Sequence, residues 1–234
     1  ADPNGGIYYG SDYFERCYEY AEQLIRKNHA IPSFLHYEGY PASICASIDD
    51  AVVHGIPSEK QILREGQILS IDCGLVLDGW QADSAFTMGI GEISPEAQRL
   101  IDVTEQCFFA GARQAIAGKR LGDVGHAVQQ VAESNGYGVI RDLTGHGIGR
   151  EMHEDPPVFN YGTPDRGLRL RKGMTIAIEP MISAGDWHIT CDADQWCYRT
   201  RDRSLTSHYE HTIAINEDGL PEILTYPDFK WEDK

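Results

Sequence analysis

Four carboxylic acids and one histidine are placed where they could share metal ions. Asp72, Glu179 and Glu210 lie at the ends of apolar segments, and Asp83 follows Asp72 in the same region. His146 lies in a glycine-rich loop. Oxygen donors in excess, with no thiolate, suit paired Mn²⁺, Fe²⁺, Co²⁺ or Zn²⁺ better than they suit a thiolate zinc site. Two such cations about 3.5–4 Å apart can activate a shared water and clamp a scissile carbonyl, so the expected chemistry is hydrolysis.

Two of these acids close the two copies of an internal repeat. Residues 64–72 (REGQILSID) align with residues 171–179 (RKGMTIAIE), and each copy reads as a turn, a buried strand and then a carboxylate. A carboxylate after such an apolar run must be paired or metal-bound. The repeat therefore predicts two halves of like construction, with Asp72 and Glu179 in corresponding places.

Residues 67–88 read as a β-hairpin, because Asp78 and Gly79 have the residue types of a tight two-residue turn. With that turn, Asp83 lies opposite Gly74, and Asp72 lies on the same face of the sheet, two residues from Gly74. Two buried carboxylates this close repel and raise one pKa, whereas a divalent cation between them removes the penalty. The register therefore favours a cation between Asp72 and Asp83.

The evidence for the other two residues is weaker when each is taken alone. His146 stands in residues 145–149 (GHGIG), whose glycines allow close approach, yet a lone loop histidine is more often a hydrogen-bonded structural group. Glu210 begins a final apolar strand from which it could reach the same site as Asp83, and His211 then points to the opposite face.

Three helices are expected around these strands. The first helix is expected over residues 12–27, where Asp12 and Glu15 have the spacing of a capping box. The second is expected over residues 123–135, with Gly136 as the stop signal, and the third follows Ser94 as N-cap. The apolar face expected for the first helix consists of Phe14, Cys17, Tyr18, Ala21, Leu24 and Ile25. Internal symmetry gives the helix after Ser94 no partner in the first half. We therefore expect one helix of that kind to be missing from the N-terminal side of the chain; the alternative is that the first half never had one.

Composition excludes several classes of protein. With 234 residues and 41% hydrophobic content, the chain suits a single core. A formal charge of −16 repels phosphate backbones and anionic headgroups, so nucleic-acid and membrane-surface partners are not expected. No apolar run reaches the roughly 20 residues of a membrane helix. The six cysteines form no CxxC pair, which favours ordinary thiols and a cytoplasmic setting, the close pair Cys191 and Cys197 included.

Several short motifs together resemble the methionine aminopeptidases. They are residues 53–57 (VHGIP), the Asp72 and Asp83 pair, residues 145–149 with His153 and Glu154, residues 178–181 (IEPM) and residues 209–212 (YEHT). Prolidase and aminopeptidase P share the five metal ligands, but residues 178–181 and 202–205 (DRSL) resemble the methionine enzyme. The resemblance covers about residues 12–226, and the short gap between Glu179 and Glu210 implies the type I class.

The resemblance implies an α+β pita-bread fold, in which two pseudo-symmetric halves form a curved antiparallel sheet covered by helices. Residues 1–11 would be an N-terminal tail, and residues 12–230 would be a single catalytic domain, with a first half of about 12–92 and a second half of about 93–230. The protein would be a cytoplasmic monomer that acts on peptides and nascent chains with N-terminal methionine.

The resemblance also implies roles for the five ligands of two divalent metal ions, Mn, Fe, Co or Zn. Asp83 and Glu210 would bridge both ions, Asp72 would complete one site, and His146 with Glu179 would complete the other. Glu179 would also handle protons while a water shared by the ions attacks the first peptide bond.

Further residues would contact the substrate. By the resemblance, His54 would lie near the new amine and His153 near the scissile carbonyl; alternatively, both are structural histidines. The residues implied to form the methionine pocket are Tyr37, Tyr40, Cys45, Met152 and Trp196. Aromatic faces and sulfur would favour a thioether there, although aromatics at such spacing are otherwise usually core. Phe34 and residues 143–144 depart from the family pattern near this cleft.

Two other functions stay open from the sequence. One is a proline-specific aminopeptidase or prolidase-like hydrolase, and the other is a non-catalytic peptide-binding relative. The presence of all five ligands argues against the second.

Overall fold

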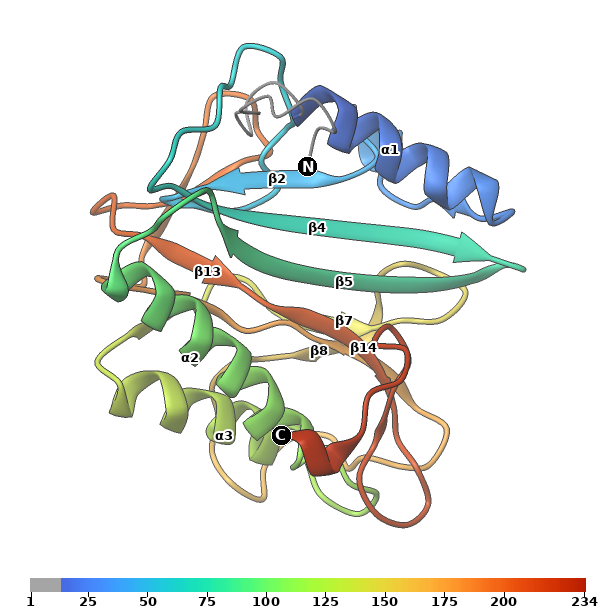
Figure 1. The fold of residues 1–234 in the computed structure, drawn as a ribbon. Helices are drawn as coiled ribbons and strands as arrows, with labels where there is room; N and C mark the ends of the chain where they lie inside the picture. Colours follow the sequence, from blue (N-terminus) through green and yellow to red (C-terminus); the bar gives the residue numbers. More distant parts are fainter. Residues whose placement is uncertain (1–13) are drawn as a thin grey trace.

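The computed structural model describes residues 14–234 (Figure 1). In this part of the chain the helices are α1 (Phe14–Lys27), α2 (Pro95–Ala112) and α3 (Leu121–Ser134), with short 3-10 turns at Tyr37–Gly39 and Trp231–Asp233. The strands, in chain order, are β1 (Ile31–Pro32), β2 (Cys45–Ile48), β3 (Ala51–Val53), β4 (Ile68–Leu77), β5 (Trp80–Gly89), β6 (Gly138–Val139), β7 (Gly145–Gly147), β8 (Glu154–Val158), β9 (Thr175–Ile178), β10 (Met181–Ser183), β11 (Ile189–Cys191), β12 (Tyr198–Thr200), β13 (Thr206–His208), β14 (Glu210–Ala214) and β15 (Glu222–Ile223).

The largest sheet joins the two halves of the chain. Its order is β1-β4-β5-β14-β9-β7-β8, with β2 also paired to β4 and β15 to β14. Strands β4 and β5 belong to the first half, and they meet the second half where β5 pairs antiparallel with β14. Two three-stranded sheets, β13-β10-β6 and β11-β12-β3, lie beside it. This arrangement confirms the expected α+β fold built on antiparallel sheets.

The β4–β5 hairpin has the register that the turn residues predict. Gly74 pairs with Asp83, and Asp72 pairs with Ala85. Asp78 and Gly79 have φ values of 51° and 77°, the left-handed conformation that a tight hairpin turn requires at both central positions. The turn chemistry therefore fixes which carboxylates face each other.

Helices α2 and α3 cover the second half, and both show the expected end signals. The Ser94 hydroxyl accepts a hydrogen bond from the backbone N–H of Ala97 at 3.1 Å, which caps α2. Helix α3 begins at Leu121, earlier than expected, because the Asp123 carboxylate accepts from the backbone N–H of Arg120 at 2.8 Å and so acts inside the first turn. Gly136, with φ of 84°, ends it.

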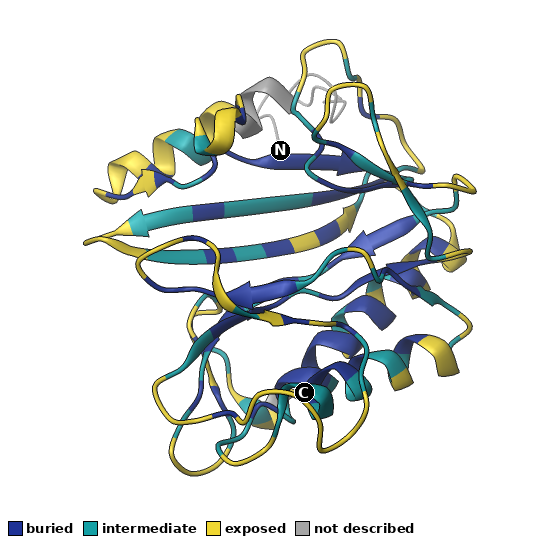
Figure 2. Ribbon diagram, turned by 180° about the vertical axis from the view of Figure 1, so that it is seen from behind, coloured by how far each residue is buried: buried dark blue, intermediate teal, exposed yellow. Residues whose placement is uncertain are grey.

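One residue of the apolar face expected for helix α1 does not face the core. Ile25 is buried, but Leu24 is 58% exposed, so the expectation for Leu24 was wrong. Helix α1 packs beside β1 at the edge of the sheet, where Leu24 faces solvent (Figure 2). The side chains of Phe14, Cys17 and Tyr18 lie outside the described part of the chain. The expected cap at Asp12 lies outside the described residues.

Part of the first-half sheet is exposed where the second half is covered. Phe86 and Met88, which alternate with buried Ala85 and Thr87 along β5, are 47% and 43% exposed. The expectation that one helix is missing is not tested by the described residues and stays a prediction.

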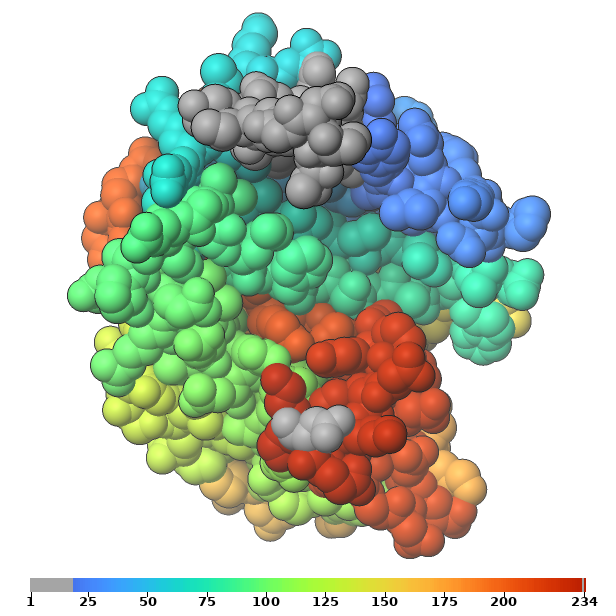
Figure 3. Space-filling model, in the orientation of Figure 1, coloured from blue at the N-terminus to red at the C-terminus, as the bar shows by residue number. Residues whose placement is uncertain are grey.

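The C-terminal segment packs on the second half (Figure 3). The Trp231 ring contacts Phe109 edge to face, and the Lys234 ammonium pairs with the Glu105 carboxylate at 2.6 Å. None of the helices within residues 14–234 has the length and apolarity that a membrane crossing requires.

Candidate metal centre and substrate cavity

Two rows of paired residues across the central strands bring the acids to one face of the sheet. In the first row, Ala85 of β5 is opposite both Asp72 of β4 and Glu210 of β14. Directly paired residues project from the same face of a sheet. Asp72 and Glu210 therefore flank a side chain that is only a methyl group, which leaves space between the two carboxylates.

The second row of paired residues places Asp83 and His146 on this face of the sheet. Thr212 of β14 pairs with Ala177 of β9, which in turn pairs with His146 of β7. On its other side the Thr212 hydroxyl accepts from the Asp83 backbone N–H at 3.0 Å and donates to the Asp83 carbonyl at 2.9 Å. Asp83 and His146 therefore stand on the same face, two residues from the first row.

Glu179 completes the cluster from the end of β9. It lies two residues beyond Ala177, so alternation along the strand predicts the same face. Its Oε1 atom is 3.7 Å from His146 Nε2. His211, by contrast, lies on the opposite face, where its Nδ1 is 2.9 Å from the Thr225 hydroxyl and its ring packs on Phe108, as expected from its position.

The orientation of His146 leaves one ring nitrogen available to a metal. Its Nδ1 is 2.8 Å from the Gly147 carbonyl oxygen, which can only accept, so Nδ1 carries the hydrogen. Burial lowers the pKa of His146 to about 4, and the ring is therefore neutral near pH 7. Its Nε2 lone pair then faces Glu179, which is the arrangement of a metal-ligating imidazole.

Several buried oxygens of the cluster lack a hydrogen-bond partner in the part of the chain that the structure describes. They are Asp72 Oδ1, Asp83 Oδ1 and Glu210 Oε1. One ligand atom each from Asp83, His146 and Glu210 lie within 4.8 Å of one another. Orphaned buried carboxylate oxygens are costly unless a cation satisfies them, so the residues present fit a divalent metal centre.

The same crowding raises the pKa of every acid in the cluster. Burial raises the pKa of Asp83 to about 7. Burial and then the neighbouring charge of Asp83 raise the pKa of Asp72, Glu179 and Glu210 well above the usual range. Without a cation, this face of the sheet therefore favours protonated acids.

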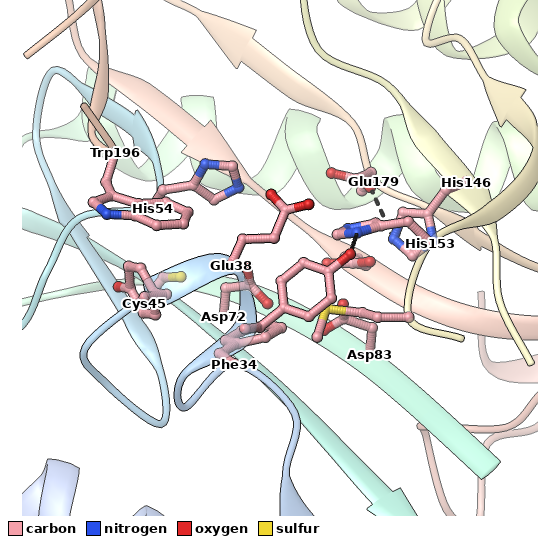
Figure 4. A pocket seen from close by; sticks show the side chains of 14 residues that line it. Phe34, Glu38, Cys45, His54, Asp72, Asp83, His146, His153, Glu179 and Trp196 are labelled. Carbon is pink, nitrogen blue, oxygen red and sulfur yellow. Dashed lines mark hydrogen bonds and ion pairs between the residues drawn. The ribbon is translucent and has the colours of Figure 1, made fainter. Parts of the chain in front are cut away.

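These groups line one cavity of about 320 Å³ (Figure 4). The structure brings every site residue that the sequence analysis named to this cavity, and Phe34 and Glu38 line it as well. The cavity has a polar end, at the acids and His146, and an apolar end around Tyr40, Cys45 and Trp196.

The apolar end is a packed cluster with sulfur and aromatic faces. Tyr40 and Trp196 are in edge-to-face contact at 5.1 Å between ring centroids. The Tyr40 hydroxyl donates to the Gly55 carbonyl at 3.0 Å, which satisfies it within the protein. Cys45 and Met152 are buried in the same cluster, together with Phe34. This end can therefore hold an apolar side chain of moderate length.

Two histidines also line the cavity, His54 on the side of Trp196 and His153 on the side of His146 (Figure 4). His153 Nδ1 is 2.9 Å from the Tyr37 hydroxyl, and its ring is 4.4 Å from that of His146. His54 adopts a left-handed φ of 59°, a conformation that costs a non-glycine residue about 1–3 kcal/mol. Burial lowers the pKa of His54 to about 4, so its imidazole is neutral near pH 7.

Comparisons with known proteins agree with this geometry. Residues 14–217 match the model of metallopeptidase family M24. The methionine aminopeptidase of Clostridium acetobutylicum is 54% identical over 205 residues, which cover 88% of this chain and 82% of that protein. The crystal structure of methionine aminopeptidase from Rickettsia prowazekii superposes with a TM-score of 0.89 at 41% identity, over 91% of this chain and 86% of that one.

The chain belongs to the methionine aminopeptidases of metallopeptidase family M24. Prolidase from Pyrococcus horikoshii shares the fold only, with a TM-score of 0.69 at 21% identity over 92% of this chain and 55% of that one. The pita-bread fold expected from the motifs is thus confirmed.

Two residues near the reacting end were missed in the sequence. Glu38 lines the cavity from the turn at Tyr37–Gly39, where its φ is 49°; no spacing rule marks such a turn residue. His208, which is 2% exposed, lies 3.7 Å from both Glu179 and Glu210 through its Nε2. The alternation that places Glu210 on the ligand face also places His208 there, two residues earlier, and would have found it.

Without cations, the free energy of unfolding should fall as the pH rises above about 6.5. The acids have raised pKa values in the folded state, about 7 for Asp83, so they bind more protons in the folded protein than in the unfolded chain. Their contribution is fully present below about pH 4 and is lost as the pH rises through about 7. The buried histidines, whose pKa values are lowered, act in the opposite direction only below about pH 6.5, where the unfolded histidines are protonated. Thermal unfolding in EDTA should therefore show a midpoint that falls from about pH 6.5 to pH 8.

The Mn²⁺-loaded protein should not show this fall, because a cation favours the ionised acids. Apo Asp83→Asn should show a shallower pH dependence than the apo wild type, since one of the titrating groups is gone. Equal slopes in the EDTA and Mn²⁺ samples would contradict the account.

Proposed function

We propose that this protein removes the N-terminal methionine from peptides and nascent chains by hydrolysis at a centre of two divalent cations. The observation that carries the proposal is the convergence of Asp72, Asp83, His146, Glu179 and Glu210 on one face, at the end of an apolar cavity. Membership in the methionine aminopeptidases supports the same substrate.

The two cations, drawn from Mn²⁺, Fe²⁺, Co²⁺ or Zn²⁺, would be held by the five residues. Glu210 belongs to both groups of close ligand atoms in the cavity, one of which includes Asp72 and the other Asp83 and His146, so these residues together with Glu179 would hold the cations. When bound, such cations polarise a scissile carbonyl and lower the pKa of water. Thr212 fixes the Asp83 backbone, which holds this carboxylate in place.

The protein's own groups then orient the substrate and move protons. Neutral His153 can donate from Nε2 to the scissile carbonyl oxygen when the Tyr37 hydroxyl donates to its Nδ1, a contact of 2.9 Å. His54 would lie near the nitrogen of the leaving amine. Glu179, at the edge of the acid cluster, would accept a proton from the attacking water and pass it to that amine.

The methionine side chain would occupy the apolar end. Its unbranched thioether suits the aromatic edges of Tyr40 and Trp196 and the sulfur atoms of Cys45 and Met152, because sulfur–aromatic contacts are favourable. A cavity of about 320 Å³ holds one such side chain beside the reacting centre.

Product analysis tests this proposal against the proline-specific alternative. We expect protein reconstituted with Mn²⁺ or Co²⁺ to release methionine from Met-Ala-Ser and to leave X-Pro peptides uncut. Leu-Ala-Ser serves as the matched control for the apolar end and should be cut much more slowly. Cleavage of X-Pro peptides without methionine release would overturn the proposal in favour of a prolidase-like activity.

Metal analysis separates the enzyme from a peptide-binding protein. We expect dialysed protein to take up about two equivalents of Mn²⁺ or Co²⁺ per chain. A protein that takes up neither and hydrolyses nothing would instead be a binding protein. Gel filtration should give the mass of a monomer.

A further inference from the structure

His208 is a buried group on the ligand face that the proposed function leaves without a role. Its side chain is 2% exposed, and its Nε2 has no hydrogen-bond partner among residues 14–234. A buried nitrogen without a partner is uncommon and calls for an explanation by an ion or another group. Two acids with equally orphaned oxygens, Asp72 and Glu210, stand beside it.

We infer that His208 is an additional metal ligand, supplying its Nε2 atom to the cation held by Asp72 and Glu210. The inference rests on the proposed metal centre and adds a sixth protein ligand to it. It would give each of the two cations one imidazole, His208 on one side and His146 on the other.

The distances between the donor atoms suit a single ion. One ligand atom each of Asp72, His208 and Glu210 lie within 4.8 Å of one another. His208 Nε2 is 3.7 Å from Glu210 Oε2 and also 3.7 Å from Glu179 Oε2. Ligands bound at about 2.0–2.2 Å from one cation lie at most about 4.4 Å apart, so the 3.7 Å separations fall within that span.

A direct hydrogen bond does not account for these separations. A histidine nitrogen that bonds a carboxylate lies about 2.7–3.2 Å from it, which is well short of 3.7 Å. His208 Nε2 is thus too far from Glu179 and Glu210 to form a hydrogen bond with either carboxylate. It is close enough to bind the same ion as one of them.

The His208 backbone is held so that the ring stays on the ligand face. The Thr87 hydroxyl accepts from the His208 backbone N–H at 3.0 Å and donates to the His208 carbonyl at 2.8 Å. Thr212 holds the Asp83 backbone in the same manner. Thr87 and Thr212 thus each hold the backbone of one candidate ligand, His208 and Asp83 respectively, where β5 meets the second half.

An imidazole in place of an oxygen ligand changes which metal the site prefers. Imidazole nitrogen suits Co²⁺ and Zn²⁺, whereas carboxylate and water oxygens suit Mn²⁺. Loss of the His208 nitrogen should therefore weaken Co²⁺ binding more than Mn²⁺ binding. A residue with a structural role alone would weaken both alike.

Calorimetric titration of the apo protein with Co²⁺ and with Mn²⁺ tests the inference. We expect His208→Gln to weaken Co²⁺ binding by at least about 10-fold and Mn²⁺ binding distinctly less. His188→Gln is the matched control, because His188 is exposed and paired with Asp186 outside the cavity; it should change neither affinity. Unchanged Co²⁺ affinity in His208→Gln, or equal losses for both metals, would overturn the inference.

A second measurement on the wild-type protein does not depend on the variant folding. In Co²⁺-loaded protein labelled with ¹⁵N-histidine, proton NMR should show two hyperfine-shifted imidazole N–H resonances, from His146 and His208. A single such resonance would overturn the His208 assignment and leave the proposed metal centre standing. Failure of the wild type to bind either metal would instead overturn the centre itself.

Discussion

Replacing Glu210 with glutamine should lower kcat for methionine release by at least about 10³-fold, because it would remove a carboxylate charge from the proposed metal centre. Glu210 is 2% exposed, and its Oε1 has no hydrogen-bond partner among the residues that the structure describes. The amide keeps the size of the side chain but cannot balance the charge of two cations. Initial rates on Met-Ala-Ser, with metal content measured on the same samples, give the comparison.

Glu217→Gln is the matched control for this variant. Glu217 is exposed and pairs with Lys172 on the surface, and it does not line the cavity. It should retain the wild-type rate. A Glu210→Gln protein with wild-type turnover and full metal content would show that Glu210 is no ligand.

The second large effect is expected at His153. His153→Ala should lower kcat by about 10²-fold, comparable with the loss of other positioned acid or electrostatic groups. The His153 ring lies 4.4 Å from the His146 ring, at the border between the acids and the apolar end, where a scissile carbonyl would sit. Metal affinity should change little, since His153 belongs to no ligand group.

Tyr37→Phe tests whether the reaction depends on how the His153 imidazole is oriented, because this variant keeps the imidazole itself. It removes only the hydroxyl that contacts His153 Nδ1 at 2.9 Å, so its loss in kcat should be smaller than that of His153→Ala. Wild-type kcat in His153→Ala would remove this histidine from the reaction.

The part of the fold that follows local chemical rules could be predicted from the sequence. Asp78 and Gly79 set the turn, the turn set the register, and the register placed Asp83 opposite Gly74. The Ser94 cap and the Gly136 stop are equally local. Their physical causes lie within a few residues of the chain, which is why the sequence alone predicts them.

The positions that depend on distant strands were harder to predict. The alignment of Asp83 with His146 passes through Thr212 and Ala177, from strands far apart in the sequence, so His146 taken alone was only a weak candidate from its glycine-rich loop. Leu24 shows the same limit, because its exposure depends on where α1 docks and not on its helical face.

The cavity residues also differ in how far the sequence alone predicts them. The apolar end was expected only through resemblance to the methionine aminopeptidases, since buried aromatics are ordinary core residues by composition. His208 lies two residues before Glu210, so strand alternation predicts it on the ligand face. It belongs to none of the motifs that carry the family resemblance, and the sequence analysis therefore did not include it. Glu38 enters the cavity through a left-handed turn that leaves no periodic signal.

Anomalous scattering from crystals soaked in Mn²⁺ tests the central claim most directly. The account predicts two peaks about 3.5–4 Å apart at the polar end of the cavity, bordered by the carboxylates of Asp72, Asp83, Glu179 and Glu210. The absence of any peak there, or Mn²⁺ bound only at other surfaces, would contradict it.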